Sequence, residues 1–206
     1  YGCEPAEGSE AGIGWNWAKQ AANLHDVVVV TRASNRAAIE AATDPPGAEF
    51  VYVEAEFWLR FKRGPRGARV YYRFWQRAAA KTIQRLHARQ PFDVAHHVTW
   101  TNVTMPVGLS RLDIPFVIGP VGGGVPPQWR LLVGTPFREI GYEIGRFLGQ
   151  RLASRSPSIR RGLAQASVIL VQNSETLAWL PQDARARARI ASYIGIHDSA
   201  IRRRPD

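Results

Sequence analysis

The stretch DVVVVT, residues 26–31, is a run of four valines closed by a threonine. Such an uninterrupted β-branched run is typical of a strand that is buried on both faces of a parallel sheet. Four other stretches have a similar composition, EFVYVE (49–54), FDVAHHV (92–98), PFVIGPV (115–121) and SVILVQN (167–173). We expect all five to be strands of one sheet.

Helical segments are predicted between these strands, over residues 13–24, 35–43, 68–89, 137–164 and 175–180. Strands that alternate with helices imply right-handed crossovers and a parallel sheet with helices on both faces. The sequence therefore predicts an α/β fold, a Rossmann-like three-layer sandwich, formed by residues 1–206 as a single domain. Residues 60–69 and the tail after Pro181 are expected to be the most flexible parts.

The chain has 206 residues and one cysteine, Cys3, so no internal disulfide can form. A single cysteine favours a reducing compartment, and we expect a cytoplasmic protein. No apolar run reaches the roughly 18 to 20 residues that span a bilayer. The chain starts with Tyr1, the first expected strand is missing or reduced to residues 1–3, and the chain stops after RRRPD. We expect a fragment of a larger protein.

A glycine-rich segment, EGSEAGIGWNWA (7–18), leads into the first expected helix. Its backbone N–H groups and the positive end of the helix dipole suit a phosphate group. The candidate ligand-binding residues are Gly8, Ser9, Glu10 and Gly12. The spacing does not follow G-x-G-x-x-G, and a tight turn would need the same glycines. Both interpretations stay open.

Two adjacent histidines, His96 and His97, lie near the end of the expected strand 92–98. Ligands of open parallel sheets bind beyond the carboxyl ends of the strands, and alternation along the strand turns the two side chains to opposite faces. A neutral imidazole there can hydrogen-bond a substrate hydroxyl or phosphate, or be satisfied by a neighbouring backbone group. We take both as candidate catalytic residues. No metal is expected, because no further ligand lies nearby at metal-binding spacing.

Three consecutive glycines, Gly122, Gly123 and Gly124, follow the next expected strand, and Gly119 lies just before them. This loop and the histidine loop should open on the same edge of the sheet. So many glycines indicate that something approaches the backbone closely, either a ligand or a facing domain. A simple turn is the alternative.

The segments CEPAEGSEAGIGWNWA, FDVAHHVTW, PFVIGPVGGG and VILVQNSET follow one another in this order. The ordered set resembles the N-terminal half of a family 4 retaining glycosyltransferase of the two-domain GT-B type, over nearly all of the chain. The resemblance implies that this domain binds the acceptor, a glycan or a lipid-linked saccharide. It also implies that a C-terminal domain of the same parent chain holds most of the nucleotide-sugar donor.

The resemblance further implies roles for individual residues. The loop from Gly8 to Gly12 would touch the donor phosphate or the acceptor, and His96 or His97 would face the transferred sugar. Many relatives carry H-x-H where this chain has adjacent histidines, so both remain candidates. The E-x7-E element of the donor domain lies outside this sequence, and we expect the domain alone to be inactive. No cofactor is expected beyond the nucleotide sugar.

Basic residues recur every four positions along the expected helix 68–89, and the chain has a net charge of +10. The series is Arg69, Arg73, Arg77, Lys81, Arg85 and Arg89. Like charges at i,i+4 repel by roughly 0.2–0.5 kcal/mol per pair, so an anionic partner would relieve a cost. We expect the first four to face an acidic membrane surface, on its cytoplasmic side, or a lipid-diphosphate acceptor. A solvated face and an arginine-rich genome are the alternatives.

Three glycines, Gly141, Gly145 and Gly149, repeat at four-residue spacing in an expected helix over residues 137–153, the first part of the helical stretch 137–164. Charged residues lie between them, so this helix is no membrane span. Close packing against another helix is the predicted reason for the glycines.

Two other function classes compete with glycosyl transfer. A non-catalytic Rossmann-like nucleotide-binding module is the alternative function, although no acidic residue ends the strand at 26–31 to bind a ribose. Nucleic acid is not an expected partner, because the chain has no recognisable reading motif and its basic residues do not alternate with stacking aromatics.

Overall fold

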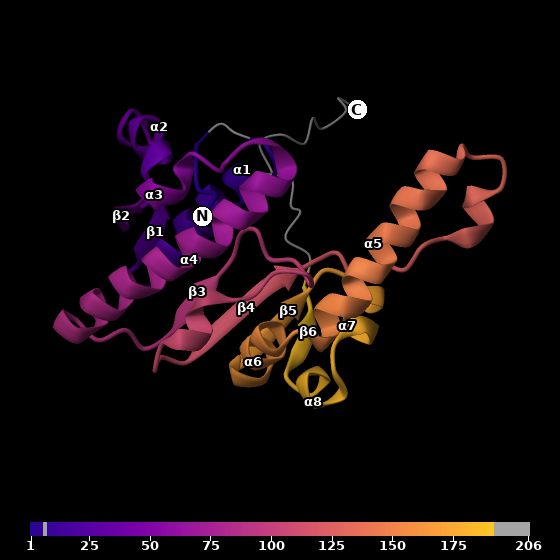
Figure 1. The fold of residues 1–206 in the computed structure, drawn as a ribbon. Coiled ribbons are helices and arrows are strands. Elements are labelled where there is room, and N and C mark those ends of the chain that lie inside the picture. The colour runs from indigo at the N-terminus through magenta and orange to yellow at the C-terminus, as the bar shows by residue number, and fades with distance from the viewer. Residues whose placement is uncertain (6–7, 192–206) are drawn as a thin grey trace, which may run out of the picture.

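The computed structural model describes residues 1–5 and 8–191, which form helices around parallel strands (Figure 1). The strands are β1 (Val28–Arg32), β2 (Glu49–Val53), β3 (Ala95–His97), β4 (Phe116–Val121), β5 (Val168–Val171) and β6 (Ala188–Ile190). The α-helices are α1 (Ser9–Ala22), α2 (Arg36–Glu40), α3 (Glu56–Leu59), α4 (Gly64–Arg89), α5 (Phe137–Arg155), α6 (Pro157–Gln165), α7 (Ser174–Trp179) and α8 (Gln182–Arg185). Short 3-10 helices are η1 (Ala33–Asn35), η2 (Gly108–Arg111) and η3 (Trp129–Leu132).

The strands form two sheets, β1-β2 and β3-β4-β5-β6, and every pairing within them is parallel. The predicted parallel α/β class is confirmed, and the arrangement is compatible with a Rossmann-like fold. The prediction of one sheet is wrong for the described residues. Residues 1–3 have no strand structure and instead lie between the two sheets. The Thr31 hydroxyl of β1 donates to the Tyr1 carbonyl over 3.1 Å, and the Gly2 N–H donates to Thr99 Oγ1, after β3, over 3.1 Å.

Helices cover both faces of the β1-β2 sheet, as the alternating side chains of its strands require. On one face Val29 and Phe50 pack with Trp15 of α1 and Ile39 of α2. On the other face the core includes Val30, Val51, Val53, Tyr71, Tyr72 and Trp75, of which the last three belong to α4. The three-layer arrangement therefore holds around β1 and β2.

The four-stranded sheet is packed more heavily on one face than on the other. Ile118 and Ile169 are buried against Ile159 and Leu163 of α6. On the opposite face Val117, Val168 and Leu170 are only half-buried.

Three sequence predictions are corrected by the structure. The expected helix 137–164 is two helices, because Ser156 precedes Pro157 and is extended, at φ −64° and ψ 123°. The expected loop 60–69 is helical from Gly64 onward. The expected flexible tail after Pro181 contains α8 and β6, which pairs with β5; residues 192–206 lie outside the described part.

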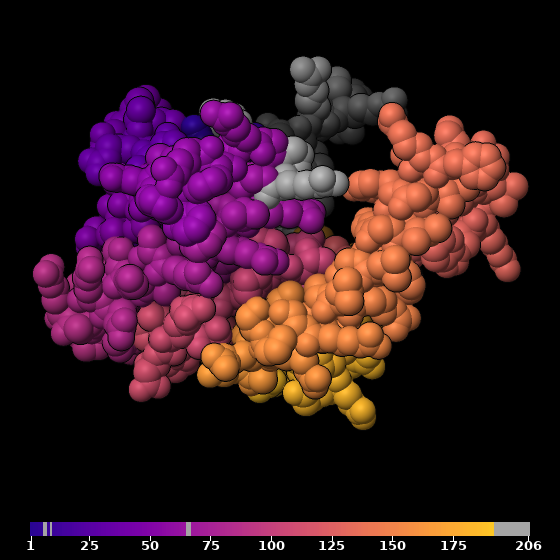
Figure 2. Space-filling view, viewed as in Figure 1, coloured from indigo at the N-terminus to yellow at the C-terminus, as the bar shows by residue number. Residues whose placement is uncertain are grey.

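Helix α5 extends away from the body of the molecule, as Figures 1 and 2 both show. Large apolar side chains on and before it face solvent, and Phe137 is 93% exposed. The exposed set is Trp129, Leu131, Val133, Phe137, Tyr142, Ile144, Leu148 and Leu152. The opposite face of α5 binds the body, through the polar contacts described below and through Ala153, which packs against the core.

Candidate functional site

The loops after β3 and β4 are joined by hydrogen bonds at the carboxyl edge of the sheet. The Gly122 N–H donates to the Thr101 carbonyl over 3.2 Å, and the Val103 N–H donates to the Gly122 carbonyl over 3.0 Å. The Thr101 hydroxyl adds a bond of 2.8 Å to the Pro120 carbonyl. The two loops therefore form one surface, which β3 and β4 hold in place.

A cavity of about 440 Å³ opens at this edge. Its wall is drawn from the first turn of α1, the start of α4 and the loops after β3, β4 and β5. The lining residues are Glu10, Ala68, Arg69, Trp100, Thr101, Asn102, Thr104, Met105, Gly122, Gly123 and Gln172. This volume lies within the range of small-molecule sites, and the position is the one at which doubly wound sheets bind ligands.

Trp100 lies in the cavity wall with a strained backbone conformation. Its φ of 60° lies in the left-handed region, which a bulky side chain rarely adopts. The Trp100 N–H donates to the Glu10 carboxylate over 2.9 Å, and the indole packs against Tyr1 and Tyr72 at ring-centroid distances of 4.8 and 5.2 Å. These contacts fix an aromatic ring beside a carboxylate.

The glycine run is explained by neighbouring side-chain and backbone atoms of the protein itself. A Cβ on Gly122 would lie 2.6 Å from the Gln172 amide, and one on Gly124 would lie 2.7 Å from Thr176 Cα. Gly123 has a φ of +85°, and a Cβ there would overlap the Asn102 amide. The expectation that a ligand or facing domain demands the bare backbone is therefore unnecessary. Gly122 and Gly123 still line the cavity, whereas Gly124 is buried behind it.

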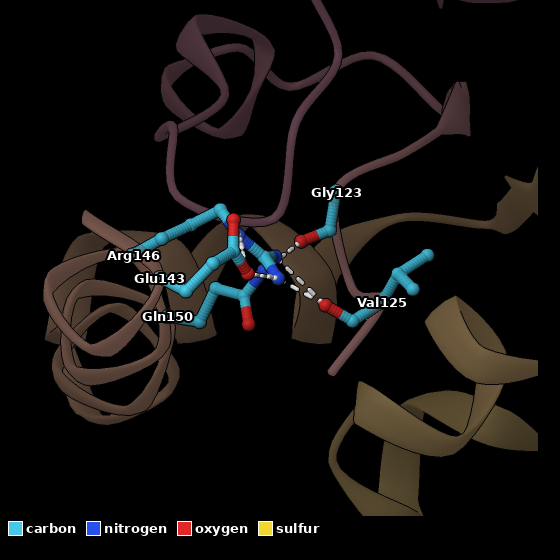
Figure 3. A network of polar contacts seen from close by, with 5 residues as sticks. All are labelled: Gly123, Val125, Glu143, Arg146 and Gln150. Atoms are coloured by element: carbon cyan, nitrogen blue, oxygen red, sulfur yellow. Dashed lines mark hydrogen bonds and ion pairs between the residues drawn. The ribbon is translucent and has the colours of Figure 1, made fainter. Parts of the chain in front are cut away.

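The polar face of α5 fixes the segment that follows these glycines (Figure 3). Gln150 Nε2 donates to the Gly123 carbonyl over 2.5 Å, and Arg146 Nη1 donates to the Val125 carbonyl over 2.8 Å. Glu143 accepts from Arg146 at 2.6 Å, and these hydrogen bonds lower the pKa of the Glu143 carboxyl. The i, i+3, i+7 spacing of these three residues puts them on one face of the helix.

The two histidines point to opposite faces of the sheet, as alternation predicts. His96 Nε2 lies 2.9 Å from the Gly119 carbonyl, and its ring meets Trp17 of α1 edge-on. His97 Nε2 lies 2.6 Å from the Tyr72 hydroxyl. Burial lowers the pKa of His97 to about 3, so the ring is neutral at physiological pH. Neither histidine lines the 440 Å³ cavity.

The glycine-rich loop contributes less to the cavity than the sequence suggested. Gly8 caps α1 and is exposed, and Gly12 lies inside the helix. Of Gly8, Glu10 and Gly12, Glu10 lines the cavity, and the Ser9 side chain lies outside the described part of the structure. Because a carboxylate occupies the first turn of α1, a phosphate at this helix end would meet a like charge.

The four basic candidates of α4 are separated by the structure. Arg69 lines the cavity, whereas Arg73, Arg77 and Lys81 are exposed further along the helix. The Arg77 guanidinium lies 5.0 Å from the centre of the Phe74 ring. Arg69 is thus separated from the other three, which lie on the exposed face of α4 away from the cavity lining.

Sequence reasoning places the loop 96–100 at this edge, and so includes Trp100, but it misses other cavity residues: Thr101, Asn102, Thr104 and Gln172. Trp100 and Thr101 lie in the loop after β3, and Gln172 directly follows β5. The rule that ligands bind beyond strand ends could have found them. The part of the cavity made by α4 had no such signal, because it depends on how α4 packs across the sheet.

Comparison of the chain with family models, with curated proteins and with solved structures finds no match. Over residues 1–5 and 8–191, no helix is both long enough and apolar enough to cross a membrane. Within the same residues, no three His, Cys, Asp or Glu side chains gather closely enough to hold a metal ion.

Proposed function

We propose that this domain is the acceptor-binding half of a retaining glycosyltransferase, which moves a sugar from a nucleotide-sugar donor to a glycan or lipid-linked acceptor. The proposal joins the ordered motifs of the sequence with the chemistry of the cavity at the carboxyl edge. The donor would be held mainly by a C-terminal domain of the parent chain, across the same edge.

One observation carries the proposal: an indole, a carboxylate and a guanidinium line the same open cavity. Trp100 offers an apolar ring on which the C–H face of a sugar can pack. Glu10 can accept hydrogen bonds from sugar hydroxyls, and Arg69 can donate to them. The Asn102 and Gln172 amides can do both. This mixture suits a neutral polyhydroxy ligand better than a dianion close to Glu10.

The histidines are assigned supporting roles in this proposal. His97 orients Tyr72, which packs against Trp100, and His96 holds the Gly119 carbonyl at the start of the glycine run. For either imidazole to contact a transferred sugar, His96 would have to leave the Gly119 carbonyl or His97 the Tyr72 hydroxyl, or the cavity would have to extend to the ring.

A nucleotide-binding module without catalytic activity is the second candidate. It would bind a nucleotide in the absence of any saccharide. The Glu10 carboxylate at the start of α1 argues against a phosphate at that helix end.

Saturation-transfer NMR of the chain with neutral oligosaccharides, nucleotide sugars and free nucleotides tests these two candidates. We expect oligosaccharide protons to receive saturation, with the signal reduced by Arg69→Gln and by Asn102→Ala. Glu56→Gln, an exposed carboxylate on α3, is the control and should leave the signal unchanged. Binding of free nucleotides alone, with no saccharide bound, would favour the module and refute the acceptor-binding proposal.

A further inference from the structure

Within residues 1–5 and 8–191, three polar atoms buried around the side chain of Tyr1 make no hydrogen bond of normal geometry: the Tyr1 hydroxyl, the Tyr71 hydroxyl and Arg32 Nε. The Arg32 guanidinium is nevertheless close enough to the Tyr1 hydroxyl to oppose the rise in its pKa that burial causes. Tyr71 is 0% exposed and Tyr1 is 7% exposed. A buried polar group without a partner is costly and indicates an absent water, ion or ligand. Each of these three groups is able to donate a hydrogen bond.

Two cations stand over the same pair of tyrosines. Arg32 Cζ lies 4.7 Å from the centre of the Tyr1 ring, and Lys62 Nζ lies 5.1 Å from the centre of the Tyr71 ring. The two ring centres are 6.5 Å apart. Tyr1, Arg32, Lys62 and Tyr71 therefore form one group, which we call the Arg32–Lys62 cluster. It lies where β1 ends and α4 passes over the sheet (Figure 1).

The cluster has excess positive charge. In the described part of the chain no carboxylate lies within 4.0 Å of either cation. Glu54, after β2, accepts from the backbone N–H of Ala55 instead. Burial and the neighbouring Arg32 charge both lower the pKa of Lys62, whereas Glu54 opposes them. The side chains of Arg32 and Lys62 are partly exposed, so these two cations can be reached from solvent, whereas the two tyrosine hydroxyls are buried beside them.

We infer that the Arg32–Lys62 cluster binds the phosphate group of a phosphomonoester. A guanidinium and an ammonium provide donors and positive charge, and the two tyrosine hydroxyls can also donate, which is what a phosphate oxygen needs. The cluster is separate from the 440 Å³ cavity, since Tyr1 and Trp100 pack edge-on between them. The inference does not depend on glycosyl transfer. A soluble phosphate compound and a phosphatidic acid headgroup share this chemistry.

Equilibrium dialysis of radiolabelled inorganic phosphate against the whole chain, at constant ionic strength, tests the site. Saturable binding is expected, weakened at least tenfold by Arg32→Gln and by Lys62→Gln. Tyr71→Phe should weaken it several-fold while leaving the unfolding temperature in phosphate-free buffer unchanged or higher. Arg85→Gln removes the same charge from an exposed position at the far end of α4 and should have no effect.

Two further experiments distinguish a lipid headgroup from a soluble phosphate compound as the source of the phosphate. Vesicle binding that requires phosphatidic acid and is lost in Arg32→Gln identifies a lipid headgroup. Competition by glycerol 3-phosphate without such vesicle binding identifies a soluble compound. Phosphate binding that is not saturable, or that falls equally in Arg32→Gln and Arg85→Gln, would overturn the inference and leave water as the partner of the buried donors.

Discussion

The Tyr72 hydroxyl lies 2.6 Å from His97 Nε2 and ties the middle of α4 to the last residue of β3. Tyr72 is fully buried, and burial raises the pKa of its hydroxyl well above the usual range, so this group stays protonated and can donate. The contact joins the helix that covers β1 and β2 to the first strand of the other sheet. The contact thereby links the two-stranded sheet to the four-stranded sheet.

Replacing Tyr72 with phenylalanine should destabilise the domain. The substitution leaves the buried His97 nitrogen without a partner, at a cost of about 1–3 kcal/mol in the free energy of unfolding. Tyr71→Phe is the matched control, because the neighbouring hydroxyl has no partner to lose. Urea denaturation of both variants measures the difference. Equal destabilisation by the two substitutions would show that the Tyr72–His97 bond contributes nothing.

Acid should weaken the fold through His97. Its pKa is about 3 in the folded chain and about 6.5 when unfolded, so the unfolded state binds more protons between these values. The stabilisation is complete above pH 6.5 and is lost as pH falls toward 3, by up to ~1.4 kcal/mol per pH unit for one proton. Urea midpoints at pH 7, 6 and 5 measure the slope. His97→Gln should flatten it, and an unchanged slope would contradict the assignment.

Alanine at the glycines of α5 should stabilise that helix. A Cβ on Gly141, Gly145 or Gly149 meets nothing within 4 Å, so the prediction that they allow close helix packing is wrong for the described residues. Each alanine should gain roughly 0.5–1 kcal/mol of helix stability.

Amide hydrogen exchange in α5 reads this gain locally, and circular dichroism reports the added helicity. Gly14→Ala is the opposing control, because its Cβ would overlap the Gly2 carbonyl oxygen and should cost about 1–3 kcal/mol. Faster exchange in the α5 variants would show that the glycines serve a contact within the chain.

The exposed basic residues of α4 should bind acidic vesicles if they face a membrane. Each basic residue near such a surface contributes about 1 kcal/mol, so replacing Arg73 and Arg77 with glutamine should lower partitioning roughly tenfold or more. Binding should also weaken as salt rises, because the Debye length shortens to about 8 Å at physiological ionic strength.

Co-sedimentation with phosphatidylcholine vesicles, with and without phosphatidylglycerol, measures this partitioning. Arg160→Gln with Arg161→Gln makes the same charge change on α6 and serves as the control. Equal loss in both double variants would reveal a net-charge effect, and no sedimentation of the wild type at low salt would remove the membrane from the proposal.

If a second domain holds the donor, as the proposed function requires, residues 1–206 alone should not transfer sugar. Transfer from a panel of radiolabelled nucleotide sugars, compared between residues 1–206 and the parent protein, measures this. Turnover by residues 1–206 at the rate of the parent would refute the two-domain proposal.

The longest patterns of the sequence predicted most of the fold. The valine run at 28–30 and the periodic stripe of α4 have enough consecutive residues to define a period, and both elements were placed within a few residues. Strand β6 was missed because Ala188–Ile190 is too short to show a pattern and depends on pairing with β5. The break before Pro157 was readable from the proline alone.

The candidate site was predicted less well than the fold. Its edge could be predicted, since strand order fixes where loops gather, and Glu10, Gly122 and Gly123 do line the cavity. The roles of individual side chains could not, because they depend on contacts between distant segments. Sequence spacing does not reveal that His97 meets Tyr72 or that Trp100 is held by Glu10.

Helix α5 holds the glycine segment through the carbonyls of Gly123 and Val125 while its apolar face stays open to solvent. Gly123 also lines the cavity, so α5 is mechanically coupled to the edge of the sheet at which the cavity opens. A tilt of α5 would either break the hydrogen bonds that Arg146 and Gln150 donate or displace the cavity wall together with the helix. A force on the exposed end of α5 would therefore be transmitted along the helix to the cavity.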